Sequence, residues 1–191
     1  MNSRYPQPSK PKSQSPAPTT VRPRVAVIGY GEGAGREHAK RLRDRGHDVR
    51  VAMLPGGMSW VRAIEDGFRP TGARTATVDA DVIVLLVPSD EIEILYWEEI
   101  APITPPGAIV IFGEAVELDD ARLPKNADVA VISMNTDGCT ISVRADATGY
   151  AHDRVLAYLQ ALGGNVPRSP SSRLRVADDT DPFPYPSRRV L

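Results

Sequence analysis

The stretch Arg24–Val51, RVAVIGYGEGAGREHAKRLRDRGHDVRV, decides the fold, because it holds a strand, a glycine-rich loop, a helix and a second strand in succession. Residues 25–28 form an unbroken apolar run, which is typical of a central strand buried on both faces of a parallel sheet. Gly46 tolerates the left-handed backbone that ends many helices, so we expect the helix to stop there. The succession predicts the first unit of a sheet that binds a dinucleotide.

The glycines of the loop each suit a different contact. Gly29 permits a tight turn out of the strand, Gly31 leaves room for a pyrophosphate, and Gly35 lets the helix lie close to the sheet. The third glycine comes one residue later than the usual pattern unless Ala34 takes its role. We expect the loop to contact the dinucleotide through Gly29, Tyr30, Gly31, Glu32, Gly33, Ala34 and Gly35. The alternative is a protein of the same fold whose loop binds no nucleotide.

Length, charge and cysteine content limit the classes of protein. A chain of 191 residues suits one domain with a substantial core. The net charge of −1 gives no field that attracts nucleic acid or an acidic membrane. A single cysteine, Cys139, excludes an internal disulfide, and no apolar stretch is long enough to span a membrane. We expect a cytoplasmic protein with a small-molecule substrate and with neither nucleic-acid nor membrane partners.

Further elements alternate along the chain. Apolar runs predict strands at residues 81–87, 108–112 and 129–133, an edge strand at 140–144 and a short last strand at 173–176. A helix is expected at residues 59–66, with Trp60, Ala63 and Ile64 facing the core. A second is expected at residues 91–100, capped by Ser89 or Asp90. A third is expected at residues 150–162, and its core-facing residues are Val155, Leu156, Leu159 and Leu162. The alternation predicts a single doubly wound α/β domain of the Rossmann type with a mostly parallel sheet.

We expect this domain to occupy residues 24–177. A flexible tail rich in Pro, Ser and Thr, residues 1–23, precedes it, and a Pro-rich extension, residues 178–191, follows it.

Candidate site residues follow the expected strands, because ligands of such sheets bind outside the carboxyl ends of the strands. Beyond the glycine loop, the expected cofactor contacts are Leu54, Ser59, Val87, Pro88 and Ser89. The same strand ends carry Glu114, Asn135, Asp137 and Cys139, but no histidine or lysine. The three histidines of the chain, His38, His47 and His152, are expected to pack or to face solvent.

Several segments together resemble a known family. The motifs VAVIGYG, LRDRG, GGMSW, DGF, ADVIVLLVP, EEIAP, PPGAIVIF and VAVIS are similar, in order and spacing, to the N-terminal cofactor domain of ketol-acid reductoisomerases. The resemblance runs from about Arg24 to Asp181. It implies a Rossmann-type fold that binds NADPH. In the family the cofactor and magnesium serve an alkyl migration and a reduction in branched-chain amino-acid synthesis.

The chain departs from the family at the residues that do the chemistry. Glu114 and Asn135 stand where the resemblance places a histidine and a lysine. Asp181 matches one magnesium-ligating aspartate, but Tyr185 replaces the glutamate expected next, and the remaining ligands belong to a helical domain beyond the last residue of this chain. Because Mg²⁺ needs several oxygen ligands, we expect no metal site and no ketol-acid isomerisation. The resemblance therefore implies a divergent, stand-alone homologue.

The cofactor is expected to be NAD(H) or NADP(H). In the loop that resembles the family's 2′-phosphate site, Leu54 replaces an arginine and Gly57 replaces a serine, leaving Ser59. Without the arginine, a 2′-phosphate loses its bidentate partner, which favours NAD(H). The strand end offers no Asp or Glu for the 2′-hydroxyl of NAD either.

Three functions are compatible with these residues. The first is reduction of a small carbonyl or imine compound without metal, with Glu114 as general acid and Asp137 and Tyr185 as lesser candidates. The second is hydrolysis of, or group transfer from, a dinucleotide that serves as the substrate. The third is a nucleotide-binding module without catalysis. For the enzyme readings we expect a homodimer or a partner subunit to cover the cofactor cleft, with Phe183 and Tyr185 as bridging groups.

Overall fold

The computed structural model describes residues 23–31, 34–113, 118–135, 138–163 and 174–177. Its strands are β1 (Arg24–Ile28), β2 (Asp48–Ala52), β3 (Val82–Leu85), β4 (Ile109–Phe112), β5 (Asp128–Asn135), β6 (Gly138–Ala145) and β7 (Leu174–Ala177). Its α-helices are α1 (Ala34–Asp44), α2 (Met58–Glu65), α3 (Ala73–Thr77), α4 (Ser89–Ile94) and α5 (Ala151–Ala161). Shorter turns of other helix types are η1 (Leu95–Ile100), η2 (Ala101–Ile103) and η3 (Asp120–Arg122).

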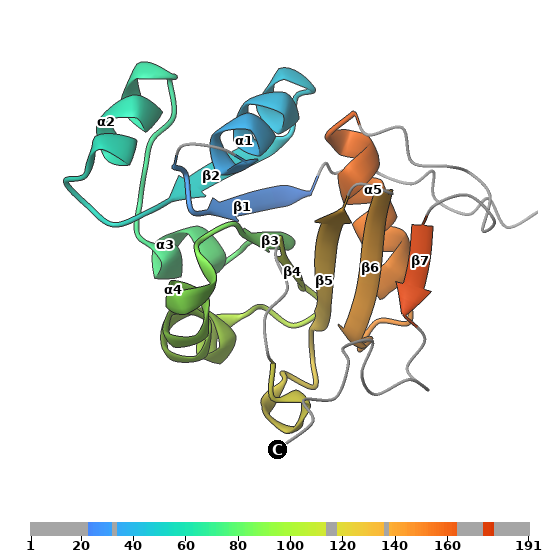
Figure 1. Ribbon diagram of the computed structural model, residues 1–191. Helices are drawn as coiled ribbons and strands as arrows, with labels where there is room; N and C mark the ends of the chain where they lie inside the picture. Colours follow the sequence, from blue (N-terminus) through green and yellow to red (C-terminus); the bar gives the residue numbers. More distant parts are fainter. Residues whose placement is uncertain (1–22, 32–33, 114–117, 136–137, 164–173, 178–191) are drawn as a thin grey trace, which may run out of the picture.

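The strands form one seven-stranded sheet in the order β2-β1-β3-β4-β5-β6-β7 (Figure 1). Strands β1 to β5 are parallel, and β6 and β7 run in the opposite direction. Strand order reverses between β1 and β3, and the crevice at such a reversal is where doubly wound sheets bind ligands. The predicted fold class, a single Rossmann-type domain with a mostly parallel sheet, is confirmed.

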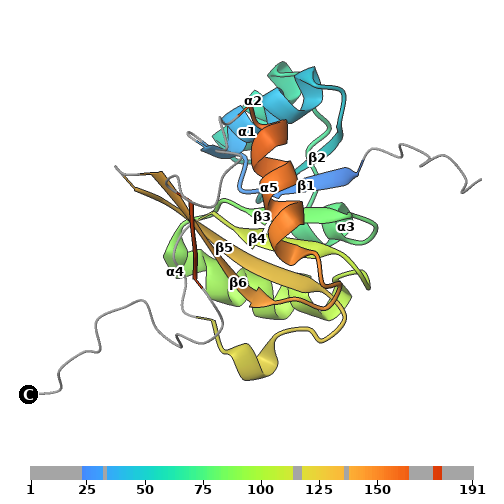
Figure 2. The ribbon, with the colours of Figure 1, turned by 90° about the vertical axis from the view of Figure 1, so that its right-hand side faces the viewer.

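Both faces of the sheet are covered by helices, which explains the unbroken apolar runs (Figure 2). Val25 and Val27 of β1 face the layer that contains α1, α2 and α5, whereas Ala26 and Ile28 face α3, α4 and η1. All four are at most 2% exposed. The prediction that residues 25–28 form a doubly buried central strand is therefore confirmed.

Three details of the elements differ from the predictions. Strand β6 is not at the edge of the sheet, because β7 pairs with its free side. The expected helix at 91–100 begins at Ser89, so Pro88 occupies the N-cap position, and it changes at Leu95 into a wider π-helical turn. Strand pairing and the type of helix both depend on contacts between residues distant in sequence. A local sequence pattern does not reveal such contacts.

Side-chain directions in two helices also differ. Ile64 is 56% exposed, because α2 packs against the core through Ala63. In α5 the predicted inward residues Val155 and Leu162 are buried, but Tyr158 is buried beside them, while Leu156 and Leu159 are half-buried. Among the described residues, no helix has the length and apolar character needed to cross a membrane.

Candidate functional site

The glycine loop leaves β1 in the conformation that its sequence predicts. Gly29 has a φ of 99°, in the left-handed region that favours glycine. A side chain there would place its Cβ 2.5 Å from the carbonyl oxygen of Leu86. The Gly29 N–H donates to the Ala52 carbonyl at 2.9 Å, and the Leu86 N–H donates to the Ile28 carbonyl at 2.8 Å. The ends of β1, β2 and β3 therefore meet at this loop.

Gly35 takes the third-glycine role, although it comes one residue late. A Cβ on Gly35 would lie 2.0 Å from the carbonyl oxygen of Gly29, so only glycine lets α1 approach the end of β1 this closely. Ala34, by contrast, is exposed. The additional residue of the loop thus leaves the close contact between helix and strand intact, and the alternative role for Ala34 is wrong.

A side chain on Gly31 would point toward the beginning of α2. Among described atoms outside the neighbouring loop positions, the nearest to a Cβ on Gly31 is Ser59 Oγ at 4.0 Å. The two predicted contact residues therefore face each other, one on the glycine loop and one in the first turn of α2. Gly31 is half-buried, and because it has no side chain a ligand can reach its backbone.

The ends of β3 and β4 form the neighbouring part of the site. Val87 is 9% exposed, and its Cγ1 would be 2.8 Å from a Cβ on Gly29. The Gly113 N–H donates to the Leu85 carbonyl at 3.0 Å, and a Cβ on Gly113 would lie 2.2 Å from Leu86 Cδ2. Pro88 is exposed beside them. The structure thus places the predicted Val87 and Pro88 at the same edge as the glycine loop.

The Tyr30 side chain is directed into the core. It is 1% exposed and packs edge-on against Phe68, with 5.4 Å between the ring centroids. Its hydroxyl donates to Asp66 Oδ2 at 2.6 Å. Burial, together with Asp66, raises the pKa of Tyr30 to about 12. The tyrosine therefore anchors the loop, and only its backbone can face a bound ligand.

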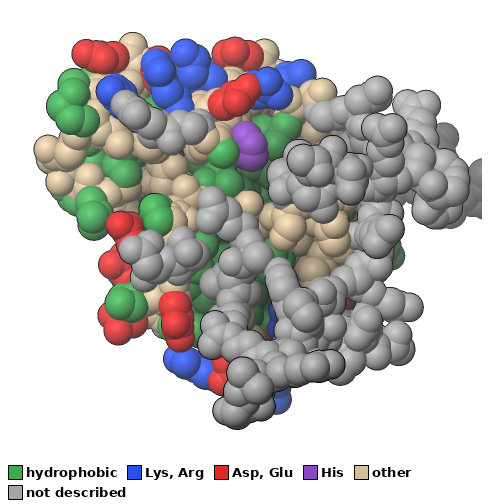
Figure 3. All heavy atoms as spheres, in the orientation of Figure 1, with side chains coloured by type: hydrophobic (Ala, Val, Ile, Leu, Met, Phe, Trp, Pro, Cys, Tyr) green, Lys and Arg blue, Asp and Glu red, His purple; other side chains and the backbone are tan. Residues whose placement is uncertain are grey.

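Asp66 collects further donors from α1. Arg36 makes a bidentate pair with it, at 2.6 and 3.0 Å, and Lys40 Nζ lies 3.3 Å from its second oxygen. The hydrogen bonds from Arg36 and Tyr30 hold the pKa of Asp66 well below its usual range. Lys and Arg side chains, mixed with acidic ones, gather along the edge of the molecule where α1 and α2 lie (Figure 3). Sequence reasoning did not identify this cluster, although the DGF motif contains Asp66.

The loop after β2 lacks a cation for a 2′-phosphate at the expected position. Leu54 is 80% exposed, and Gly56 and Gly57 face open space among the described residues. An apolar side chain at position 54 cannot pair with a phosphate. The next cation after this loop, Arg62, belongs to α2 and has an interaction of its own, and the cation before it, Arg50, is paired with Asp79.

Several predicted residues lie outside the described part of the chain. These are Glu32, Gly33, Glu114, Asp137 and Tyr185, and the side chains of Ser89 and Asn135 are likewise outside it. Cys139 is described, and burial raises the pKa of its thiol, which disfavours the nucleophilic thiolate. His38 contacts Tyr158, with 2.7 Å between Nδ1 and the hydroxyl, which confirms its packing role. Within the described residues, no group of three or more His, Cys, Asp or Glu side chains could hold a metal ion.

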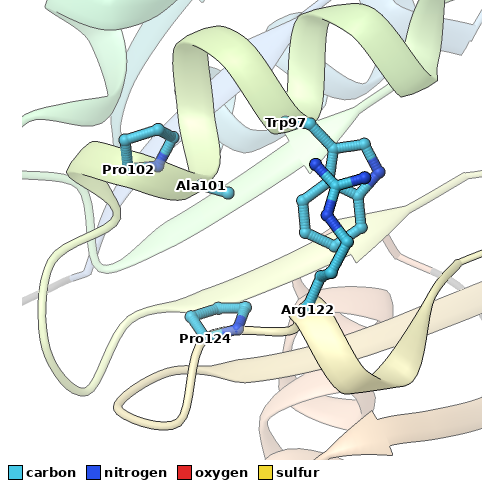
Figure 4. A pocket seen from close by; sticks show the side chains of 5 residues that line it. All are labelled: Trp97, Ala101, Pro102, Arg122 and Pro124. Atoms are coloured by element: carbon cyan, nitrogen blue, oxygen red, sulfur yellow. The ribbon is translucent and has the colours of Figure 1, made fainter.

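A separate pocket of about 390 Å³ lies on the other layer of the molecule (Figure 4). The guanidinium of Arg122 stacks over the Trp97 ring at 4.3 Å from its centroid. The remaining lining residues are Ala101, Pro102 and Pro124. None of the described glycine-loop residues lines it, so this pocket is distinct from the candidate site at the strand ends.

A known protein family matches most of this chain. Residues 21–167 match the family described as acetohydroxy acid isomeroreductase, NADPH-binding domain. The ketol-acid reductoisomerase resemblance predicted from the sequence is thereby confirmed, as is a nicotinamide dinucleotide as the cofactor of the family.

Solved structures share the fold. An NADH-preferring ketol-acid reductoisomerase from an uncultured archean is 25% identical, with a TM-score of 0.65 over 73% of this chain and 48% of that one. This chain therefore spans about half the length of that enzyme. An imine reductase from Pseudomonas sp. is 18% identical, with a TM-score of 0.58 over 83% and 57% of the two chains. A 3-hydroxyisobutyrate dehydrogenase from Mycobacterium tuberculosis is 16% identical, with a TM-score of 0.57 over 81% and 54%.

Proposed function

Because the chain belongs to the family of acetohydroxy acid isomeroreductase NADPH-binding domains, we propose that it binds a nicotinamide dinucleotide at the glycine loop and reduces a small carbonyl or imine compound without a metal ion. The observation that carries the proposal is the position of Gly31, which has no side chain and where a Cβ would lie 4.0 Å from Ser59 Oγ. This glycine adjoins the strand-order reversal between β1 and β3.

The described residues fit the pyrophosphate of such a cofactor. The absence of a side chain on Gly31 lets the group approach the backbone, and α1 begins next to the loop, so its N-terminus adds a partial positive charge. Gly35 brings α1 close enough to the strand for this arrangement. When bound, NADH or NADPH supplies the hydride.

The chain must then supply a proton donor beside the substrate. We assign this role to Glu114, which follows Gly113 at the end of β4, and consider Asp137 and Tyr185 as lesser candidates. Glu114 stands where the family resemblance places a histidine. A carboxyl group can donate a proton to the carbonyl oxygen or imine nitrogen while the hydride adds to the carbon, and it needs no metal to do so. We propose no step through magnesium, because the described residues hold no group of ligands for it.

The exposed Leu54 supports a preference for NADH over NADPH. A 2′-phosphate in this loop would meet an apolar side chain and the hydroxyl of Ser59. We also propose that the second wall of the cleft comes from another subunit, as a homodimer or a partner protein, because a single Rossmann domain covers only one side of its cofactor. A cytoplasmic location is part of the same proposal.

A second candidate function is nucleotide binding without catalysis. The specific observation in its favour is that Glu114 and Asn135 replace a histidine and a lysine of the family pattern. A module of this kind retains the glycine loop and dispenses with the residues that act on a substrate.

Calorimetric titration with NAD, NADH, NADP and NADPH tests the proposal. We expect binding, with NADH bound more tightly than NADPH, followed by oxidation of NADH in the presence of a member of a carbonyl and imine panel. Binding without turnover supports the non-catalytic module, and cleavage of the dinucleotide without a reducible substrate makes the dinucleotide the substrate. Glu114→Gln should abolish turnover and leave NADH binding intact; unchanged turnover contradicts the role of Glu114.

A further inference from the structure

Helix α2 contacts the glycine-loop unit at both of its ends. Near its start, Ser59 Oγ would lie 4.0 Å from a Cβ on Gly31. Just beyond its last residue, Asp66 accepts hydrogen bonds from Tyr30 and Arg36, each at 2.6 Å. A helix of eight residues is about 12 Å long. One short, rigid element therefore links one side of the cleft to the residues that flank the glycine loop.

The Asp66 side chain is nearly buried, whereas its partners Arg36 and Lys40 are partly exposed to solvent. Only 11% of the Asp66 side chain is exposed. Tyr30 lies within the loop, and Arg36 and Lys40 lie after it, on α1. The Asp66 carbonyl also accepts a hydrogen bond from Arg43, whose guanidinium lies 4.4 Å from the centroid of the Phe68 ring. Four donors thus hold this end of α2 against the first βα unit.

We propose that Asp66 is a positioning residue for dinucleotide binding. By holding Tyr30 and Arg36, it fixes α2 and sets the distance between Gly31 and Ser59. Its side chain is directed to Tyr30 and α1, so it acts on the ligand only through these residues. The inference rests on the proposed function, since it concerns the affinity of the same site.

The pair Tyr30–Asp66 sets the geometry that both the pyrophosphate and the adjoining ribose require. We therefore expect loss of Asp66 to weaken binding of the adenosine diphosphate half, which NADH and ADP-ribose share. Recognition of the nicotinamide should not change. Releasing Arg36 and Lys40 from Asp66 would also add free positive charge near the loop, which by itself would strengthen anion binding. Weaker binding after loss of Asp66 would therefore result from displaced groups at the site, and not from the change in charge.

The chain offers a matched control for this experiment. Asp79 also holds two arginines, Arg24 of β1 at 2.5 Å and Arg50 of β2, but it lies just before β3, at the opposite end of the strands from the glycine loop. Titration calorimetry with NADH and with ADP-ribose would compare wild type, Asp66→Asn, Tyr30→Phe and Asp79→Asn, each with its melting temperature. Tyr30→Phe removes only the hydroxyl and keeps the ring on Phe68, so it decides the question if Asp66→Asn does not fold.

We expect Asp66→Asn to weaken both ligands by roughly tenfold, Tyr30→Phe to weaken them by a smaller factor in the same direction, and Asp79→Asn to leave both affinities within about twofold. Three results would overturn this inference while leaving the proposed function intact. The Asp66 and Tyr30 variants could bind as tightly as wild type, or Asp66→Asn could bind more tightly. Alternatively, Asp79→Asn could lose as much affinity as Asp66→Asn at a similar melting temperature. A wild-type protein that binds none of the dinucleotides contradicts the proposed function, and the inference with it.

Discussion

A Cβ on Gly35 would lie 2.0 Å from the carbonyl oxygen of Gly29, so the first helix and the first strand touch backbone to backbone. Gly35→Ala should force them apart. We expect a loss of about 1–3 kcal/mol in the free energy of unfolding, as in other overpacked sites, together with loss of dinucleotide binding. Urea denaturation and calorimetry measure the two effects.

Gly72→Ala is the control for that substitution. Gly72 has a φ of −77°, and a Cβ there meets no described atom within 4 Å. Its stability should change by less than about 1 kcal/mol. Equal stability of the two variants would show that the contact between Gly35 and Gly29 does not constrain the fold.

Leu54→Arg should shift cofactor preference toward NADPH. The substitution places a guanidinium in the loop where the 2′-phosphate of the family's cofactor is expected, and Leu54 is 80% exposed, so the new side chain has room. We expect NADPH affinity to rise by roughly tenfold relative to NADH, as one charge-assisted pair permits. Ile94→Arg adds the same charge at an exposed position of α4. If both variants change the ratio equally, the loop does not recognise the 2′-position.

Arg154 stabilises the edge of the sheet opposite the candidate site. It donates to the fully buried carboxylate of Asp128 at 2.8 Å and to the carbonyls of Gly107 and Asp81. Arg154→Met would leave a buried charge with only the hydrogen bonds of Thr148. We expect destabilisation of about 3 kcal/mol or more, measured by denaturation.

The exposed pair Arg144–Asp120 provides the comparison. The Asp120 side chain is 58% exposed, so Arg144→Met should cost less than about 1 kcal/mol. Similar losses in Arg154→Met and Arg144→Met would contradict the importance assigned to burial of Asp128.

Stability should fall as the pH drops below about 6.5, in part because of His38. Burial lowers the pKa of His38, against a smaller opposing effect of Glu37. Below its unfolded-state pKa of about 6.5, the unfolded chain binds the proton more readily than the folded one, so folding loses free energy until the lowered folded pKa is reached. Denaturation curves at several pH values should show this slope in wild type and a smaller one in His38→Gln. If both proteins show the same slope, groups other than His38 cause the pH dependence of stability.

Local sequence patterns predicted the core strands and the first βα unit well. Residues 25–28 must be apolar on both sides to lie between β2 and β3, and Gly29 and Gly35 meet steric demands that no other residue satisfies. The residues that meet these requirements all lie between positions 25 and 35. They are therefore visible in a single segment.

Contacts between distant segments were not predictable in the same way. Tyr30 and Asp66 are 36 positions apart, and no periodicity links a loop tyrosine to the residue after a later helix. The pairing of β7 with β6 likewise depends on a segment that follows α5. Ile64 faces outward because tertiary packing selects Ala63, although both fit the helical spacing. The catalytic assignments to Glu114, Asp137 and Tyr185 remain predictions.

Binding at Gly31 tests the central claim most directly. A Cβ on Gly31 meets no described atom nearer than Ser59 Oγ at 4.0 Å, so Gly31→Val should fold with a nearly unchanged melting temperature while its side chain fills the space proposed for the pyrophosphate. Calorimetric titration of wild type and Gly31→Val with NADH is the measurement. The account predicts binding by wild type and its loss in the folded variant. Equal NADH affinity in the two proteins, or no binding by wild type, would contradict it.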